Sequence, residues 1–218
     1  MKLYSFFRSS AAYRVRIALN LKGLSYEVIP IHLVKNGGEQ LTPEYRELNP
    51  MALVPAFIDD GAEHDTVLTQ SLAIIEYLEE RYPMPPLLPE NAGDRAYVRS
   101  IALSIACDIH PLNNLRVLRY LVRDLNVSED DKNAWYRHWV EQGLISIETL
   151  LAKDRRVGKF CFGDSPTMAD CCLIPQIANA QRFNCDLSNV PTIMRIHDAC
   201  IVLDAFANAA PANQPDAE

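Results

Sequence analysis

The spacing of hydrophobic and polar residues divides the chain into two parts. In the first part, short apolar runs alternate with stretches whose apolar positions recur at helical spacing. This pattern predicts strands at 2–6, 26–31, 54–58 and 66–69, and helices at 10–22, 43–48 and 71–81. Gly23 suits the end of the first helix, and Asp60-Gly61 suits a hairpin turn. The order β-α-β-α-β-β-α predicts a small α/β domain.

A proline-rich segment at residues 82–89 follows, and we expect it to connect two domains because proline is excluded from helix interiors. Beyond it the spacing is helical almost to the end. It predicts helices near 94–125, 129–152, 167–182 and 190–208, and a frayed tail at 211–218. The expected organisation is an α/β domain at 1–82, a linker at 83–91 and an all-helical domain at 92–218.

Charge and length limit the classes of partner. The chain has 218 residues, with 21 Lys and Arg against 28 Asp and Glu, which gives a net charge of -7. This balance argues against nucleic acid or an anionic membrane surface as the main partner. No apolar run approaches the roughly 20 residues of a membrane span, and we expect no signal peptide. An anionic substrate would therefore need a local cluster of positive charge.

The cysteine pattern indicates neither a metal site nor a redox motif. None of the six cysteines falls in a CxxC pair, and no His–Cys cluster has the spacing of a zinc site. Most have apolar neighbours in sequence, so we expect reduced, buried thiols in a cytoplasmic protein and no metal.

Candidate chemistry begins at Arg8-Ser9-Ser10, where the first strand turns into the first helix. One interpretation is plain capping, with Ser10 as the N-cap and Ser9 in the loop. The other is an anion site, because a helix N-terminus carries partial positive charge and Arg8, Arg14 and Arg16 add formal charge nearby. A serine hydroxyl there could donate a hydrogen bond to a thiolate. Since GxSxG is absent and no acid–base partner is visible, Ser9 is not expected to be a nucleophile.

Two further segments have a structural and a functional interpretation. Pro55 is predicted to open a strand, and a cis Val54–Pro55 bond would leave the Val54 backbone placed to pair with an extended peptide, although sequence alone does not reveal cis geometry. Gln70-Ser71 opens a helix, where it is either an ordinary cap or a site whose backbone N–H groups and Ser71 hydroxyl hold a carboxylate.

Together these segments resemble the zeta class of the glutathione transferase superfamily. The stretch SSAAYRVRIAL at 9–19 is similar to the class signature SSCxxRVRIAL, and the resemblance extends over essentially the whole chain. The other matching segments are NPMALVP at 49–55, QSLAIIEYLE at 70–79, PQIANAQRF at 175–183 and QPD at 214–216.

The resemblance implies a thioredoxin-like α/β N-terminal domain, an all-α C-terminal domain, glutathione as cofactor and a homodimer. It implies a glutathione-dependent cis-trans isomerase that converts maleylacetoacetate to fumarylacetoacetate in tyrosine and phenylalanine catabolism. The alternatives are a maleylpyruvate isomerase of gentisate catabolism and a general glutathione-conjugating transferase. A non-catalytic glutathione-binding module is a further alternative, and the retention of Ser9 with several arginines argues against it.

The resemblance also implies roles for individual residues. Ser9 would stabilise the glutathione thiolate, with Ser10 beside it and Arg8 facing the anionic substrate. The implied glutathione ligands are Ser9, Ser10, Arg14, Gln40, Val54, Pro55, Gln70, Ser71, His110 and Asn114. The implied substrate ligands are Arg8, Arg116 and Arg182. His110 could instead be a packed histidine, and Arg182 could be an ordinary cation at a helix end.

Two details complete the comparison with the class. Ala11 stands where the class has Cys, which puts side activities in doubt more than isomerisation, because glutathione carries its own thiol. Lowering a free thiol pKa of about 8.5 by about two units requires roughly 2.7 kcal/mol, the order of one charge-assisted hydrogen bond plus a helix dipole. Thr167 and Asp170 have capping-box spacing and are expected to support folding.

Overall fold

The structure is a computed structural model that describes residues 1–61 and 66–218. It forms two compact units, one of Met1–Leu87 with Val202–Glu218 and the other of Leu88–Ile201. The units differ from the expected division, because the last 17 residues pack with the N-terminal α/β unit rather than with the helical one. Phe206 and Ala209, both fully buried, anchor this C-terminal segment.

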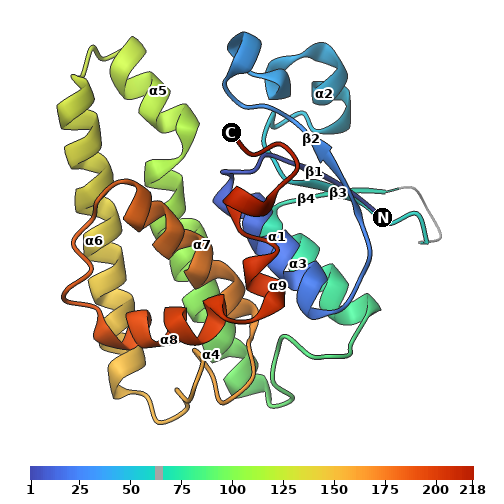
Figure 1. Ribbon diagram of the computed structural model, residues 1–218, viewed down its shortest axis with the longest axis vertical. Coiled ribbons are helices and arrows are strands. Elements are labelled where there is room, and N and C mark those ends of the chain that lie inside the picture. The colour runs from blue at the N-terminus through green and yellow to red at the C-terminus, as the bar shows by residue number, and fades with distance from the viewer. Residues whose placement is uncertain (62–65) are drawn as a thin grey trace. The chain divides into compact units, whose positions relative to one another are not determined.

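The first unit is built on a four-stranded mixed sheet (Figure 1), whose strand order is β2-β1-β3-β4. Strands β1 and β2 are parallel, and β1–β3 and β3–β4 are antiparallel. The strands are β1 Lys2–Ser5, β2 Glu27–Pro30, β3 Ala56–Ile58 and β4 Val67–Thr69. The predicted order of elements is confirmed, and Asp60 and Gly61 lie in the predicted turn; residues 62–65 are outside the described residues.

Two helices, α1 and α3, pack together in this unit. The α-helices of the N-terminal segment are α1 Ser10–Leu21, α2 Pro43–Leu48 and α3 Ser71–Arg81, with short 3-10 turns at Lys35–Gly37 and Glu39–Leu41. Gly23 follows α1 with φ +66°, a left-handed conformation that glycine adopts without steric cost. Leu3, Ile17, Phe57 and Ile74 are fully buried, so apolar faces of the sheet and of both helices form one core.

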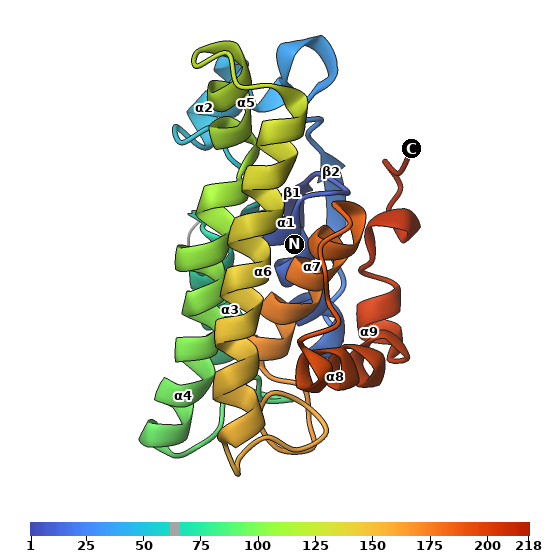
Figure 2. The same cartoon turned by 90° about the vertical axis from the view of Figure 1, so that its left-hand side faces the viewer.

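The second unit is built of helices joined by loops (Figure 2), and α4 packs along α7. Its α-helices are α4 Ala92–Leu103, α5 Leu115–Arg123, α6 Glu129–Lys153, α7 Met168–Arg182 and α8 Pro191–Ile201. The prediction of one helix over 94–125 was wrong. A π-helical turn at Ser104–Ile109 and a 3-10 turn at His110–Asn113 interrupt it, because Pro111 cannot continue an α-helix and Asn114 caps a new one.

The C-terminal predictions also need correction. A single helix over 190–208 was wrong, since α8 ends at Ile201, Leu203 is extended and a short helix α9 follows at Asp204–Ala207. The tail at 211–218 is ordered rather than frayed. Its Gln214 is 8% exposed, and its amide donates to the Asn208 and Ala210 carbonyl oxygens. These bonds and a 3-10 turn at Pro211–Asn213 give the tail a defined path.

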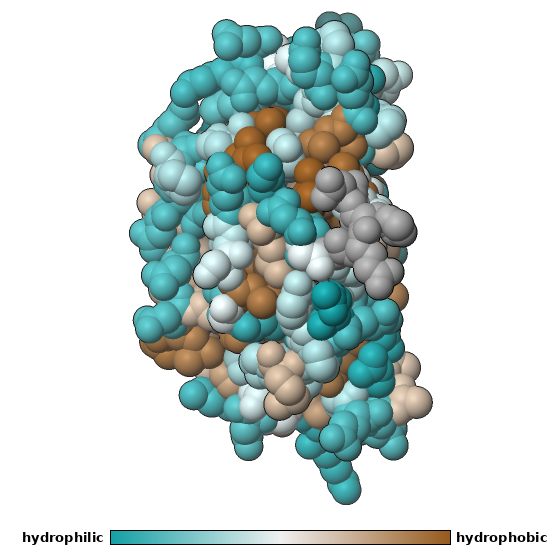
Figure 3. Space-filling model, turned by 90° about the vertical axis from the view of Figure 1, so that its right-hand side faces the viewer, coloured by the Kyte–Doolittle hydropathy of each residue, from teal (hydrophilic) through white to brown (hydrophobic). Residues whose placement is uncertain are grey.

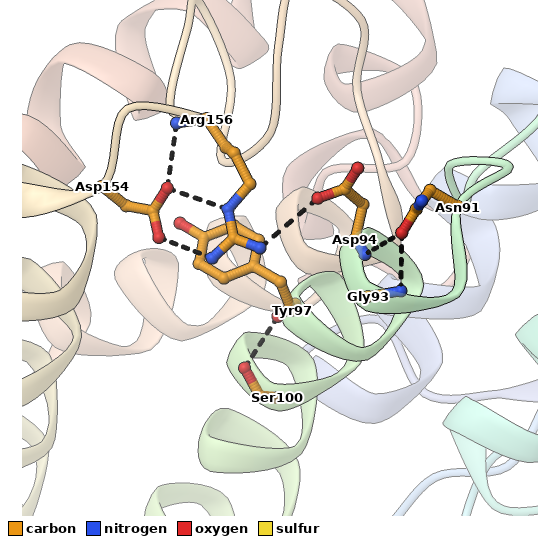
Figure 4. Close-up of polar contacts among 7 residues, drawn as sticks. All are labelled: Asn91, Gly93, Asp94, Tyr97, Ser100, Asp154 and Arg156. Carbon is orange, nitrogen blue, oxygen red and sulfur yellow. Dashed lines mark hydrogen bonds and ion pairs between the residues drawn. The ribbon is translucent and has the colours of Figure 1, made fainter.

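A polar cluster fixes the connection between α6 and α7 to the start of α4 (Figure 4). The Arg156 guanidinium donates to both carboxylate oxygens of Asp154, at 2.9 and 2.7 Å, and lies 3.4 Å from Asp94. It also lies over the Tyr97 ring, 3.8 Å from its centroid. Figure 4 shows the Asp154, Asp94 and Tyr97 side chains gathered around the guanidinium, which ties the loop to α4.

Asp170 has the folding role predicted for it. Its buried carboxylate accepts hydrogen bonds from the Thr167 N–H at 2.7 Å, the Thr167 hydroxyl at 2.9 Å and the Cys161 N–H at 2.9 Å. These bonds close the capping box at the start of α7. Burial raises the pKa of Asp170, and the three donors oppose that rise.

The cysteine prediction is correct for four of the six residues. Cys161, Cys171, Cys172 and Cys200 are buried and Cys185 is intermediate, whereas Cys107 is exposed and contradicts the expectation of a buried thiol. All six are free. Among the described residues, no helix is both long and apolar enough to span a membrane. Hydrophilic side chains cover most of the face drawn in Figure 3, between a few hydrophobic patches.

Candidate active site

Ser9 begins α1 and caps it. Its hydroxyl oxygen accepts a hydrogen bond from the Ala12 N–H at 3.2 Å, so Ser9, not Ser10 as expected from capping alone, is the N-cap. Ser10 is instead the first helical residue, and it is 5% exposed. A capping serine uses a lone pair, which leaves its O–H proton available to another acceptor. Capping and donation to a thiolate are therefore compatible roles for the one hydroxyl.

The turn before Ser9 is packed on one side and open on the other. Phe6 and Phe7 are buried in a cluster with Tyr45 and Val54, and the Ser9 N–H closes the turn on the Phe6 carbonyl oxygen at 2.9 Å. Arg8, which lies between Phe7 and Ser9 in the sequence, is exposed, and its guanidinium carbon is 4.9 Å from the Phe7 ring centroid. Stacking on a fixed ring holds a cation beside Ser9 while leaving its N–H groups open to an anion.

The other two arginines near this turn are buried. Arg14 is 2% exposed, and its Nη1 donates to the Ser71 hydroxyl oxygen at 3.2 Å, which joins α1 to the start of α3. Arg16 is fully buried, and burial lowers its pKa to about 10, so it keeps its charge at neutral pH. Of the three, only Arg8 has an exposed side chain. Arg14 is thus buried and contacts the start of α3 through Ser71.

The start of α3 has an unusual backbone conformation. Gln70 precedes the helix with φ +68° and ψ 115°, and its side chain makes no capping hydrogen bond. Non-glycine residues in such conformations cost of order 1–3 kcal/mol and cluster at functional sites. Neither α1 nor α3 has an acidic residue in its first turn, so both helix N-termini keep their positive character. The Val54–Pro55 bond, whose geometry was left open by the sequence, is cis.

Gln40 is more enclosed than a simple surface ligand. It is 6% exposed, its Nε2 lies 3.5 Å from the Leu33 carbonyl oxygen, and its Oε1 is buried with no hydrogen-bond partner among the described residues. Gly38, at φ +114°, closes over it, since a Cβ there would stand 2.7 Å from the Gln40 amide. A buried amide oxygen without a donor is the kind of group that a bound N–H would satisfy.

Four predicted site residues, His110, Asn114, Arg116 and Arg182, belong to the second unit. The Asn114 amide nitrogen lies 3.4 Å from the His110 Nε2, and because the amide can only donate, that ring nitrogen accepts. Arg116 follows in α5 and is exposed. Arg182 ends α7 with its guanidinium carbon 4.8 Å from the Phe183 ring, which stacks on Tyr136 at 3.6 Å. Burial raises the pKa of Tyr136 to about 12, with Arg182 opposing the rise.

The first unit fits a bound thiol peptide. Two helix N-termini without acidic residues, the exposed Arg8 and the buried Arg14 favour carboxylate and thiolate groups. The buried Gln40 oxygen offers an acceptor for a peptide N–H. By contrast, the described residues contain no group of three His, Cys, Asp or Glu side chains that could hold a metal ion.

Comparison with known proteins agrees with this description. Residues 3–86 match the family model of the glutathione S-transferase N-terminal domain. The chain is 50% identical over 215 residues to a probable maleylacetoacetate isomerase of Vibrio cholerae, covering 99% of this chain and 97% of that protein.

Two solved structures are similar along their whole length. A holo structure of maleyl pyruvate isomerase, described as a bacterial zeta-class glutathione S-transferase, is 50% identical with a TM-score of 0.95, and both chains are fully covered. A maleylacetoacetate isomerase from Methylobacterium extorquens AM1, with bound malonate and glutathione, is 41% identical with a TM-score of 0.94, again with full coverage of both chains.

Sequence reasoning missed the contribution of the C-terminal tail. The Asp216 carboxylate oxygen Oδ2 accepts a hydrogen bond from the Phe7 N–H at 3.0 Å, and Arg16 binds the Ala209 carbonyl oxygen at 2.9 Å. Both contacts lie at the turn that leads to Ser9. The apolar residues Leu203, Phe206 and Ala209, spaced three apart across the end of the helix predicted at 190–208, were the available signal that the chain stays packed there.

Proposed function

This chain belongs to the zeta class of the glutathione transferase superfamily, and we propose that it is a glutathione-dependent cis-trans isomerase of maleylacetoacetate. The class and fold predicted from the sequence are thereby confirmed. The observation that carries the proposal is the Ser9 hydroxyl, which caps α1 with a lone pair and keeps its proton free to stabilise a thiolate.

Each candidate site residue of the first unit is assigned a part in binding or in orientation. Glutathione, when bound, supplies a thiolate that adds reversibly to the activated double bond and so permits rotation. Ser9 donates its proton toward the sulfur, and the N-terminus of α1 adds a favourable dipole. Ser71, polarised by Arg14, and the backbone N–H groups of α3 hold a carboxylate. Gln40, Gln70, Val54 and Pro55 contact the peptide part, and Ser10 supports the helix start beside Ser9.

The substrate is an anion, so cations orient it. Arg8 is exposed beside Ser9 and stacked on Phe7, which suits it to pair with a carboxylate and to stabilise enolate charge. Arg116 and Arg182 supply further cations from the second unit, with His110 and Asn114 as additional glutathione contacts. The mechanism requires no covalent nucleophile from the protein, which is consistent with Ala11 in the position where the class has Cys.

Maleylpyruvate is the alternative substrate, and it has a specific observation in its favour. The chain is 50% identical both to a relative named for maleylacetoacetate and to one named for maleylpyruvate. We favour maleylacetoacetate, and the specificity constants of purified protein for the two substrates test the choice. A much higher kcat/KM for maleylpyruvate would replace our assignment with the alternative.

Reversible catalysis is distinguished from conjugation by the fate of glutathione. An isomerase requires glutathione for turnover and returns it unchanged after many cycles. A conjugating transferase instead accumulates the conjugate and turns over chloro-nitrobenzene-type electrophiles well. Isomerisation that proceeds at the same rate without glutathione, or one conjugate formed per molecule of product, would refute the proposal.

We also propose that the enzyme is a cytoplasmic homodimer. Six cysteines that form no disulfide bond suit a reducing compartment. Both units expose large apolar side chains that association would cover, including Met51 at 58% and Met84 at 73% in the first unit and Leu103 at 46% in the second. Light scattering should give twice the 24.6 kDa mass of one chain, and a monomer mass at micromolar concentration would contradict the dimer.

A further inference from the structure

The C-terminal segment binds the backbone N–H of Phe7, the residue two positions before Ser9, and it also holds the arginine that binds the Phe7 carbonyl oxygen. The Phe7 N–H donates to Asp216 Oδ2 at 3.0 Å, and the Phe7 carbonyl oxygen accepts from Arg16 Nη2 at 3.0 Å. Arg16 is held in turn by the segment, because its Nε donates to the Ala209 carbonyl oxygen at 2.9 Å. The Phe7 backbone is thus fixed at its N–H directly by the segment and at its carbonyl oxygen through a buried cation.

The same guanidinium fixes the rest of the turn. Arg16 Nη1 donates to the Ser5 hydroxyl oxygen at 2.9 Å and lies 3.4 Å from the Phe6 carbonyl oxygen, which also accepts the Ser9 N–H at 2.9 Å. Arg16 is 0% exposed, so these bonds form away from competing water. The backbone from Ser5 to Ser9 therefore has little freedom, and neither does the position of the Ser9 hydroxyl.

The last residue is anchored nearby. Glu218 forms an ion pair with Lys35 and lies 3.5 Å from His32 Nε2. The His32 Nδ1 accepts the Val34 and Lys35 N–H groups, so its Nε2 carries the proton and faces the carboxylate. The His32 ring packs edge-on against Phe6 at 4.9 Å. The tail thus ends on the loop that supports the turn, with Asp216 held between this anchor and the buried Gln214.

We infer that residues 202–218 are a positioning element for the thiol site, in which Asp216, together with Arg16, holds the turn that presents Arg8 and Ser9. This inference rests on the proposed function of Ser9. Asp216 touches no reacting atom in this scheme; it acts through the Phe7 N–H. A carboxylate that only stabilised the fold would gain from pairing both oxygens, yet Asp216 Oδ1 is buried without a hydrogen-bond partner among the described residues.

The test compares Asp216→Ala with Asp216→Asn, because an amide oxygen keeps the acceptor and removes the charge. The thiol pKa of glutathione bound to each protein is measured from thiolate absorbance. Loss of the Phe7 bond should raise this pKa by about 0.5–1 unit in Asp216→Ala, the equivalent of one ordinary hydrogen bond, and leave Asp216→Asn close to wild type. A direct effect of the Asp216 charge predicts the opposite, a lower thiol pKa in both variants.

A readout without glutathione accompanies the titration. Amide hydrogen exchange at Phe7 in the free protein should become about tenfold faster in Asp216→Ala, as expected for one lost hydrogen bond, and not in Asp216→Asn. The matched control is Asn213→Ala, which removes a bond inside the tail, Asn213 Nδ2 to the Ala207 carbonyl oxygen at 2.8 Å, and leaves the turn untouched. It should change neither readout. A chain ending at Gln214 serves as a second variant if Asp216→Ala does not fold.

Ser9→Ala in the same titration separates the positioning role of Asp216 from the thiolate-stabilising role of Ser9. If Ser9→Ala raises the thiol pKa and neither Asp216→Ala nor the shortened chain does, the positioning role is refuted while the function of Ser9 stands. If Ser9→Ala leaves the thiol pKa unchanged, the proposed function of Ser9 fails first. A lower melting temperature in Asp216→Ala with an unchanged thiol pKa would reduce the tail to a structural support.

Discussion

At the scale of single residues, the local environment of a hydroxyl or amide group determines its role in the site, and residue type alone does not. Ser9 and Ser10 are adjacent serines, yet one caps α1 with a partly exposed side chain and the other is 5% exposed inside the first turn. Their sequence predicted a helix start and a possible anion site. It could not decide which serine caps, because the deciding bond, Ala12 N–H to Ser9, depends on where the turn from Phe6 places the backbone.

Gln70 gives a prediction at this scale. Glycine adopts positive φ without steric cost, so Gln70→Gly should stabilise the protein by up to about 1 kcal/mol while removing a side chain proposed to contact glutathione. We expect an equal or higher midpoint in urea unfolding together with a higher KM for glutathione.

Ala73→Gly is the matched control for Gln70→Gly, because Ala73 is an exposed position inside the same helix. It should lower stability by about 1 kcal/mol and leave the KM for glutathione unchanged. A Gln70→Gly protein with an unaltered KM would remove Gln70 from the set of ligands.

At the scale of elements, the break in the helix predicted over 94–125 has a tertiary cause. Helical spacing persists through residues 104–113, so apolar periodicity alone read the segment as α-helix, although Pro111 and the Asn113-Asn114 pair signalled a break. What holds the break is tertiary. Trp135 in α6 donates its ring N–H to the Leu112 carbonyl oxygen at 2.8 Å, and Gly143 allows Ile109 to pack against α6. Neither contact is visible in a local window of sequence.

Gly143 supplies the element-scale prediction. A Cβ at this position would stand 2.4 Å from the Ile109 side chain, which is 3% exposed. Overpacking costs about 1–3 kcal/mol, and the higher helix propensity of alanine offsets about 1 kcal/mol of this cost. Gly143→Ala should therefore lower the stability of the protein slightly. It should also displace the turn that carries His110 and Asn114. Denaturant unfolding and the KM values measure the two effects.

A double-mutant cycle provides the control for Gly143. Ile109→Ala removes the clashing carbons, so in that background Gly143→Ala should be stabilising, with a coupling of about 0.5–3 kcal/mol. Additive effects of the two substitutions would show that Ile109 and Gly143 do not determine the turn.

The Asp154–Arg156 pair gives a pH prediction for the loop between α6 and α7. The side-chain hydrogen bonds from Arg156 lower the pKa of Asp154 to about 2 from its ordinary 3.8. A depressed carboxyl pKa stabilises the folded state above pH 3.8, and that contribution disappears as the pH falls towards 2. Arg156→Gln should therefore flatten the loss of stability between pH 4 and pH 2, measured by urea unfolding, and an unchanged slope would contradict this.

At the scale of the whole molecule, the chain order of the domains could be predicted from sequence, but not which residues complete them. The proline-rich segment marked the change from α/β to helical structure, and the glutathione transferase fold is confirmed. The return of residues 202–218 to the first unit depends on the buried Arg16, whose role no spacing rule predicts. Residues 1–87 and 202–218 of the first unit therefore both contribute contacts around the candidate thiol site.

The most direct test of the account is the single-turnover rate of isomerisation at saturating glutathione for wild type, Ser9→Ala and Ser9→Gly. Alanine at an N-cap costs about 1 kcal/mol of stability and glycine only a few tenths, so the two variants separate folding from chemistry. Both variants should isomerise the substrate about 10- to 100-fold more slowly at pH 7, which corresponds to the loss of one hydrogen bond to a charged group. Their rates should rise towards the wild-type rate at higher pH, because the thiol then ionises without help from Ser9. A Ser9→Gly enzyme as fast as wild type at pH 7 would contradict the account.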